Sequence, residues 1–366
     1  MLGYFLLLLI FGTFLFLSLS LGLREWLYPK SVNPLPVDVD FVRLENYFGT
    51  AFRAKLREWL GGSLMNLPLG AVHTPRGETI RVVPNGSFAI ASENACDEII
   101  CSGGNLEISR SDCNFTREIY SQGNFVAQHG VQARAIAADG YVVLGKGSAI
   151  LRWVDAKGRI LLQQGTTIGS RVSSLQSVEI EPGVRVASLF APLIFTSDFA
   201  SAATNRNDSR SFESATNDGM VYKECATKPN FLLGVSKARF LAGRWFVPGD
   251  LVLPAGTMVE KPLVVRGILR SGDACCFAGD IRAAKIVLGT RNQVHGNVAS
   301  GGAIDAGEFT CIDRNISADQ DVMLRNGVSV GSSNLLASVS AGKSLLLQSS
   351  VTVCGKLVAN KGVITQ

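Results

Sequence analysis

The sequence predicts an all-β fold, a parallel β-solenoid with coils of about 18 residues. The first observation is a motif repeated between Gly279 and Gly362: a large apolar residue, a small residue two positions later and a second apolar residue six positions after the first. Its copies begin at Ile281, Val298, Ile316, Val339 and Leu357, in steps of 17, 18, 23 and 18 residues. The second observation is composition, because 38 Gly and few helix-forming runs after residue 60 favour short strands and turns.

The same motif is found earlier in the chain. It begins at Ile100, Ile119, Ile136, Val154, Val172 and Leu189, and later at Phe240 and Leu263. We expect the second apolar residue of each copy to point inward. These residues are Leu106, Phe125, Val142, Ile160, Val178, Phe195, Phe246, Leu269, Val287, Ile304, Val322, Leu345 and Val363. The motifs therefore define a first solenoid block at 80–196 and a second at 236–366, here called block 1 and block 2.

Strand geometry explains the motif. Positions i and i+2 of a strand point to the same side, so a large and then a small inward residue suit a strand approaching a tight corner. A third face follows the same rule, for example at Val131 and Ala133 or Val351 and Val353. Three faces of six residues make one triangular coil. Thirteen such coils, stacked at the strand spacing of about 4.8 Å, would extend over roughly 60 Å.

Residues 1–23 contain no charged side chain and are rich in Leu and Phe. At 1.5 Å per residue they are long enough to predict a transmembrane helix. A cleaved signal peptide is the alternative, but no Lys or Arg precedes the apolar run. Arg24 and Lys30 follow it, so the positive-inside rule predicts a single-pass protein of the inner (cytoplasmic) membrane, with its N-terminus outside and its body in the cytoplasm.

Residues 24–39 contain three prolines and predict a linker, and residues 40–62 predict an amphipathic helix. Its apolar face is formed by Phe41, Leu44, Phe48, Phe52, Leu56 and Trp59. Arg53, Lys55 and Arg57 are expected on or near the other side. The helix has two interpretations: a cap over the open end of the solenoid, or a helix that lies on the inner leaflet.

Residues 197–235 interrupt the motif with a polar run that lacks periodicity, and we interpret them as an insertion between the blocks. The sequence contains no catalytic constellation, no metal-ligand spacing and no cofactor motif. Its eight cysteines form no C-x-x-C pair, which favours buried thiols in a reducing compartment. The net charge of +5 comes without a basic run interleaved with aromatics, which argues against nucleic-acid binding.

The segments Ala278–Gly289 and His295–Ser300 carry the paired phrases Gly-Asp-Ile and Gly-Asn-Val, 17 residues apart. In these phrases the chain resembles the bactofilins, the polymer-forming cytoskeletal family of bacteria. The resemblance covers residues from about Leu263 to the C-terminus and more weakly those from Ile100 to Phe195. It implies a right-handed parallel β-helix that assembles end to end into filaments and, at a membrane, localises cell-envelope proteins. The chain departs from the family pattern in its length, its two blocks and its apolar N-terminus.

The repeat by itself favours a similar function. A solenoid without a recognisable site is most simply a non-enzymatic scaffold, and a bare end coil is a template for another copy. No helix is predicted after the last unit, so the sequence predicts self-association through Leu357, Val363 and Ile364. Two alternatives stay open: a left-handed β-helix acyltransferase, which also has 18-residue coils, and an extracytoplasmic adhesin or glycan-binding β-helix.

Overall fold

The computed structural model describes residues 2–27, 44–61, 69–74, 77–88, 95–197 and 238–366, in two compact units, Met1–Leu44 and Glu45–Gln366. Most of the predicted linker and insertion, at 28–39 and 198–235, therefore lies outside the described residues. The first unit contains helix α1 (Leu2–Leu27). Of the helices in the described ranges, none is both long and apolar enough to cross a membrane, so the predicted transmembrane helix is not confirmed.

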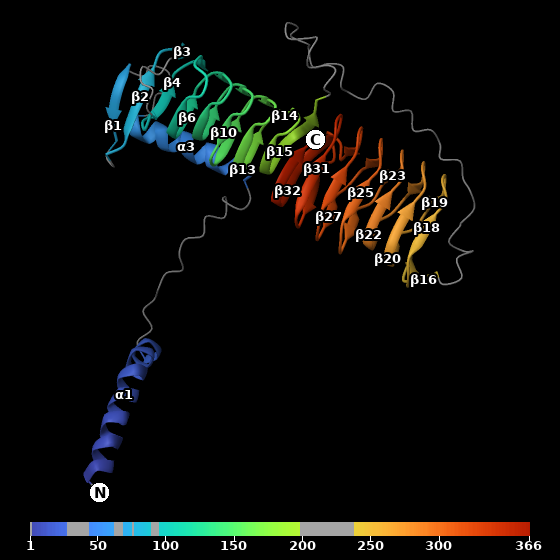
Figure 1. The fold of residues 1–366 in the computed structure, drawn as a ribbon, viewed down its shortest axis with the longest axis horizontal. Helices are drawn as coiled ribbons and strands as arrows, with labels where there is room; N and C mark the ends of the chain where they lie inside the picture. The colour runs from blue at the N-terminus through green and yellow to red at the C-terminus, as the bar shows by residue number, and fades with distance from the viewer. Residues whose placement is uncertain (1, 28–43, 62–68, 75–76, 89–94, 198–237) are drawn as a thin grey trace. The chain divides into compact units, whose positions relative to one another are not determined.

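The second unit is a β-solenoid of about 13 turns with coils of about 18 residues, which confirms the predicted class of fold. Figure 1 shows the strands of successive coils lying side by side through both blocks. Within each block, successive coils pair in parallel, so the backbone groups of an inner strand are satisfied by its two neighbours.

Block 1 opens with a hairpin that begins at Gly70, before the predicted start at residue 80, and continues as stacked coils. The hairpin consists of β1 (Gly70–His73) and β2 (Thr79–Val83). The coils contain β3 (Gly86–Phe88), β4 (Ile99–Ser102), β5 (Leu106–Ile108), β6 (Asn114–Ser121), β7 (Phe125–Ala127), β8 (Gln132–Ala138), β9 (Val142–Leu144), β10 (Ala149–Ile150), β11 (Trp153–Ala156), β12 (Ile160–Leu162), β13 (Thr167–Ser174), β14 (Ser177–Ile180) and β15 (Arg185–Thr196).

Block 2 has the same organisation and also opens with a hairpin. Its hairpin consists of β16 (Arg239–Leu241) and β17 (Arg244–Val247). Its coils contain β18 (Leu251–Leu253), β19 (Met258–Val259), β20 (Leu263–Ser271), β21 (Cys276–Phe277), β22 (Ile281–Leu288), β23 (Gln293–Val294), β24 (Val298–Ser300), β25 (Ile304–Ala306), β26 (Cys311–Ile312), β27 (Ile316–Ala318), β28 (Val322–Leu324), β29 (Ser329–Val330), β30 (Ala337–Ala341), β31 (Ser344–Leu347) and β32 (Thr352–Thr365).

The first apolar residues of the predicted motifs stack on one another as expected. In block 1 the ladder runs through Ile100, Ile119, Ile136, Val154, Val172 and Leu189. In block 2 it runs through Leu263, Ile281, Val298, Ile316, Val339 and Leu357. All of these side chains are buried in one core that passes through the inside of both blocks. Their burial is the main stabilising contribution to the fold.

Four residues that were predicted to point inward are not buried in the core: Phe195, Phe240, Phe246 and Val287. Ile194 and Ile286 occupy the ladder positions expected for Phe195 and Val287. In both coils the second inward residue follows the first, Leu189 or Ile281, by five positions rather than six, and a shift of one residue turns a strand side chain to the opposite face. The motif expected at Phe240 and Phe246 is instead the antiparallel hairpin β16–β17, in which Trp245 and Val247 are the buried residues.

Asparagine and aspartate side chains connect the corners of successive coils. Oδ1 of Asn85 accepts a hydrogen bond from the backbone N–H of Asn105 at 2.7 Å, and Oδ1 of Asn105 accepts one from Asn124 at 2.9 Å. Asp280 does the same for Asn297 in block 2, at 2.7 Å. These contacts satisfy backbone donors at corners where strand pairing is interrupted.

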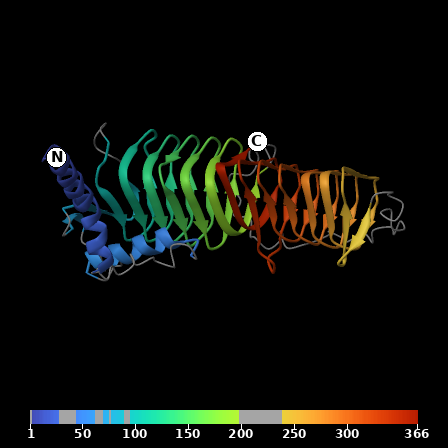
Figure 2. The same ribbon diagram turned by 90° about the horizontal axis from the view of Figure 1, so that it is seen from below.

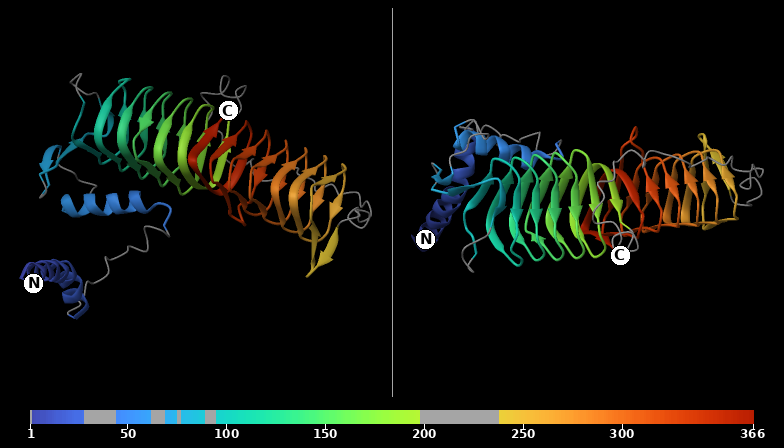
Figure 3. Two further views of the ribbon diagram at one scale, coloured as in Figure 1. Left: turned by 60° about the horizontal axis from the view of Figure 1, so that its bottom comes forward. Right: turned by 90° about the horizontal axis from the view of Figure 1, so that it is seen from above.

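Helix α3 (Tyr47–Trp59) is shorter than the predicted helix over 40–62 and lies along the side of block 1 (Figure 3). Phe48, Phe52 and Leu56 pack on outward-pointing side chains of five successive strands. These side chains are Ile80, Val82, Ile99, Cys101, Tyr120, Ala135, Ala137 and Trp153. The helix therefore covers an apolar strip on the side of block 1. It does not cover the end coil as the cap interpretation expected.

Candidate functional site

The two blocks meet through their last coils. Strand β15 pairs antiparallel with β32, so the C-terminus lies in the middle of the solenoid rather than at one end (Figure 2). The three residues predicted for self-association all lie here: Leu357 opposite Leu189, Val363 opposite Val186, and Ile364 opposite Arg185. The expectation that this end is bare is therefore wrong. Its strand edge is paired within the chain, and pairing between copies through these residues stays a prediction.

Two threonines mark the sides of this junction between β15 and β32. On one side, Thr196 donates its backbone N–H to the carbonyl of Val351 at 3.0 Å, and its Oγ1 accepts from the N–H of Val351 at 2.9 Å. The Thr196 hydroxyl then donates to the carbonyl of Gln348 at 2.7 Å.

On the other side, Thr365 donates its backbone N–H to the carbonyl of Val184 at 3.2 Å, and its Oγ1 accepts a hydrogen bond from the N–H of Val184 at 3.0 Å. Its hydroxyl donates to the carbonyl of Glu181 at 2.7 Å. The junction therefore has approximate twofold symmetry. Sequence reasoning missed both threonines, although each follows the last inward residue of its block, Ile194 or Val363, by two positions.

Both remaining ends of the solenoid carry hairpins. Among the described residues, β1 pairs only with β2 and β16 only with β17, which leaves one edge of each outer strand without a partner strand. Figure 1 places β16 at the end of block 2 farthest from the C-terminus. Phe240 and Leu241 of β16 are 52% and 55% exposed, which is unusual for large apolar residues at a strand edge. We call residues 239–247 the β16 end.

A buried ion cluster holds α3 on block 1. Arg53, which was expected on the polar side of the helix, is 4% exposed and points toward the side of block 1 that α3 covers. Its guanidinium bonds to Asp155, to Asp139 at 2.6 Å and to the carbonyl of Ala138 at 2.6 Å. Gly49 allows this close approach, because a Cβ at that position would overlap the Asp155 carboxylate. The periodicity missed Arg53 because it assigned all charged residues to the exposed face.

The segment just before α3 contacts both blocks. Glu45 accepts a hydrogen bond from Nζ of Lys356 in β32 at 2.6 Å, and its backbone carbonyl accepts one from Arg171 in β13 at 3.3 Å. The Arg171 guanidinium also lies 5.6 Å from the centre of the Phe48 ring, a cation–π distance. The residue before α3 is therefore attached to the junction, while the helix itself packs on block 1.

The reactive side chains of the described residues do not form an activated centre. The seven described cysteines are buried or half-buried. Cys311 lies 3.8 Å from Asp313, which binds His295 at 2.7 Å, but burial raises the pKa of the Cys311 thiol, and a protonated thiol is a weak nucleophile. No group of three or more His, Cys, Asp and Glu in the described ranges has metal-site geometry.

Comparison with known proteins finds no matching family model, no matching curated protein and no matching solved structure.

Proposed function

We propose that the chain is a non-enzymatic scaffold that assembles with copies of itself through a solenoid end and holds cell-envelope proteins in place. The β16 end is the observation that carries this proposal, because it combines a strand edge that has no partner strand among the described residues with exposed Phe240 and Leu241. The likeness of Ala278–Gly289 to bactofilins supports the same function and would make the solenoid right-handed.

The proposal moves the self-association surface from the C-terminal coil to the β16 end. A strand edge offers backbone donors and acceptors to a second strand, and the exposed side chains supply apolar area. The junction supports this type of contact, because there two solenoid ends of this chain already pair antiparallel. If the β16 end pairs with the β16 end of a second copy, the contact is a closed twofold dimer. Longer polymers then also require a contact through the other end of the solenoid, at the β1–β2 hairpin.

The matched variants Leu241→Asp and Leu336→Asp test the proposal. Leu336 is 51% exposed and lies just before β30, in the same block but several coils away from the β16 end, so both variants replace an exposed leucine by the same charge. Sedimentation and electron microscopy of the purified protein should show assemblies for the wild type and Leu336→Asp, and smaller species for Leu241→Asp. A strictly monomeric wild type would contradict the proposal, whereas discrete trimers would favour the acyltransferase alternative.

Membrane attachment through residues 1–23, with the body in the cytoplasm, stays a prediction. Cell fractionation of the full chain and of a variant lacking residues 1–23 measures it, with the deletion expected to shift the protein from the membrane fraction to the supernatant. A reporter fused after Gln366 measures orientation. A reporter that is active only outside the cytoplasm would contradict the predicted orientation and favour the adhesin alternative.

A further inference from the structure

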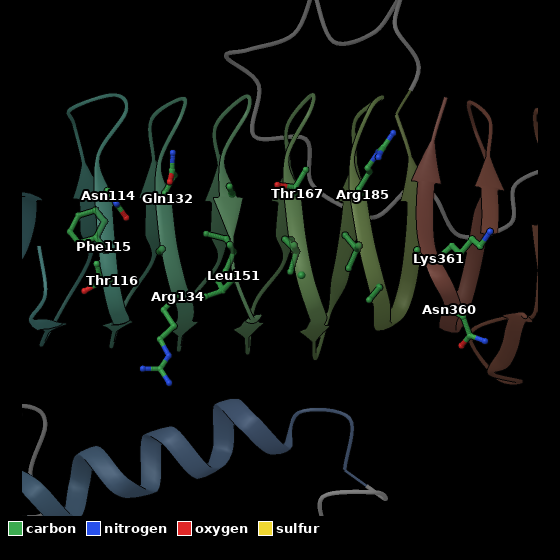
Figure 4. A pocket seen from close by; sticks show the side chains of 18 residues that line it. Asn114, Phe115, Thr116, Gln132, Arg134, Leu151, Thr167, Arg185, Asn360 and Lys361 are labelled. Carbon is green, nitrogen blue, oxygen red and sulfur yellow. The ribbon is translucent and has the colours of Figure 1, made fainter. Parts of the chain in front are cut away.

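A groove of about 720 Å³ runs along the side of the solenoid where the coils bend from their third face into their first. One wall of this lateral groove is a row of side chains from neighbouring coils, in the order Asn114, Gln132, Ala149, Thr167 and Arg185. Figure 4 shows these strands side by side, with Lys361 of β32 beyond Arg185. The groove therefore crosses the junction and is completed by residues from both blocks.

The charge in the groove is of one sign. Its lining contains Arg134, Arg185 and Lys361 and no carboxylate. Arg134 already has an acidic partner, since its Nε lies 3.3 Å from Glu118. Arg185 and Lys361 are exposed, and neither forms an ion pair with any described residue. Both lie at the junction end of the groove, so that end is suited to a negatively charged ligand.

The rest of the lining is polar but uncharged. Asn114, Gln132 and Thr167 offer amide and hydroxyl groups that both donate and accept hydrogen bonds, as the backbone of an extended peptide requires. At Gly169 there is no side chain to fill the groove, and a Cβ there would overlap the carbonyl of Leu151. Leu151 itself is 71% exposed and gives the groove one apolar contact.

Size and shape also favour an extended peptide. Five coils at a spacing of about 4.8 Å give a groove of roughly 19 Å, which holds about six residues in extended conformation. Strands β8 and β13 are paired on both sides, so a ligand is held by side chains rather than by addition to a sheet edge. No exposed aromatic ring lines the groove, which disfavours single-stranded nucleic acid, whose bases stack on aromatic platforms.

We infer that the lateral groove binds an extended acidic segment of a recruited protein, with its carboxylates over Arg185 and Lys361. The inference rests on the proposed scaffold function and names the chemistry of its partner. Because the groove is complete only when the blocks are docked, partner binding depends on the junction.

Fluorescence anisotropy of the full chain with labelled peptides tests this inference. The probes are peptides of about ten residues, which is long enough to fill the groove at ~3.3 Å per residue. They consist of Gly, Ser and Leu, and in the series Asp or Glu replaces none, a few or half of these residues. We expect affinity to rise with acidic content, and Arg185→Gln and Lys361→Gln each to weaken the acidic probes about tenfold.

Two controls make the result specific. Arg152→Gln removes the same charge from an exposed position outside the groove, and it should leave binding unchanged. Ala149→Trp fills the groove without changing its charge and should abolish binding. Equal losses of affinity for the acidic peptides in Arg152→Gln and Arg185→Gln, or no binding of these peptides to the wild type, would overturn the inference.

Anionic oligosaccharide and single-stranded DNA serve as competing probes. Binding of either in place of the acidic peptides would assign the groove to another class of ligand and overturn the inference. Sedimentation of the same variants separates this inference from the proposed function, because Arg185→Gln and Lys361→Gln should assemble like the wild type. Loss of assembly in Leu241→Asp, with peptide binding retained, would show that the two properties are independent.

Discussion

Thr196 and Thr365 make the same three hydrogen bonds on opposite sides of the junction between the two solenoid blocks. Each exchanges two bonds with a valine of the other block, Val351 or Val184, and donates its hydroxyl to a carbonyl three residues before that valine. An arrangement in which the same elements contact each other from both sides is typical of a twofold interface between identical subunits. Here one chain provides both halves.

The two threonines should contribute equally to stability. Thr196→Val and Thr365→Val each remove a hydroxyl and leave a buried valine N–H without its acceptor, which costs about 1–3 kcal/mol. Urea unfolding of the two single variants and the double variant measures this. The effects should be similar in size and should add, because the sites lie at opposite ends of the paired strands.

Thr352→Val is the matched control for this pair. Thr352 is half-buried on the same strand as Thr365, and no hydrogen bond of its hydroxyl is recorded among the described residues, so its substitution should change stability little. A Thr365→Val variant as stable as Thr352→Val would mean that the junction does not depend on the hydroxyl.

The junction should hold the blocks together without the connecting chain. A protease site inserted between Thr216 and Asn217 allows the chain to be cut in the predicted insertion, and the two pieces should still elute together in gel filtration. Val363→Asp buries a charge opposite Val186 and should separate the cut pieces. Val252→Asp carries the same change at an exposed site and should leave them associated. Separation of the wild-type pieces would contradict the junction.

Arg53→Met should release α3 from block 1. The substitution leaves Asp139 and Asp155 without their cation, and removing one partner of a buried ion pair typically costs about 3–5 kcal/mol. Limited proteolysis within α3, with Trp153 fluorescence as a second probe of the helix, measures the effect. Arg57→Met, at an exposed position of the same helix, should behave like the wild type.

Acid should weaken the docking of α3. Burial acts to raise the pKa of Asp139, but hydrogen bonds from Lys157 and Arg53 outweigh it, so the pKa lies below its ordinary value of 3.8. A carboxylate with a depressed pKa stabilises the folded state above its unfolded pKa and loses that contribution as pH falls through the folded value. Proteolysis with an acid-active protease should therefore cut α3 faster as pH falls below about 4.

Asp139→Asn tests the origin of this pH dependence. The variant lacks the titrating group, so its rate of α3 cleavage should already be raised at neutral pH and should change less on acidification. An unchanged acid dependence in Asp139→Asn would assign the effect to other carboxylates.

Cys101 should report whether α3 is docked. It is fully buried beneath the helix, and burial raises the pKa of its thiol to about 12. Alkylation by iodoacetamide, followed residue by residue with mass spectrometry, should be much slower at Cys101 than at half-buried Cys311. Arg53→Met should accelerate alkylation of Cys101 and leave Cys311 unchanged. Equal rates at the two cysteines in the wild type would show that the helix does not protect this surface.

Much of the solenoid could be predicted from the sequence because its signal is local. Apolar residues such as Ile119 and Ile136 recur at the period of one coil, and a residue that stacks on its equivalent must occupy the same position in every coil. The errors at Phe195 and Val287 arise where a corner is one residue shorter, because neighbouring apolar residues then compete for the same inward position.

The contacts between distant segments could not be predicted in this way. Arg53 looked like an exposed helix residue, because nothing in its neighbourhood indicates that Asp139 and Asp155 face it from successive coils. The lateral groove is equally hidden, since Arg185 and Lys361 lie far apart in the sequence and line one groove only through the junction.

The sequence by itself determined the repeat, its period and the inward ladder from Ile281 to Leu357, because these depend on the alternation of side chains along a strand. Only the tertiary structure decided what covers the last coil. The edge of a strand is formed by backbone groups that are alike in every sequence, so periodicity cannot specify its partner. The pairing of β15 with β32 therefore turned the end that looked bare at Val363 and Ile364 into the centre of the solenoid.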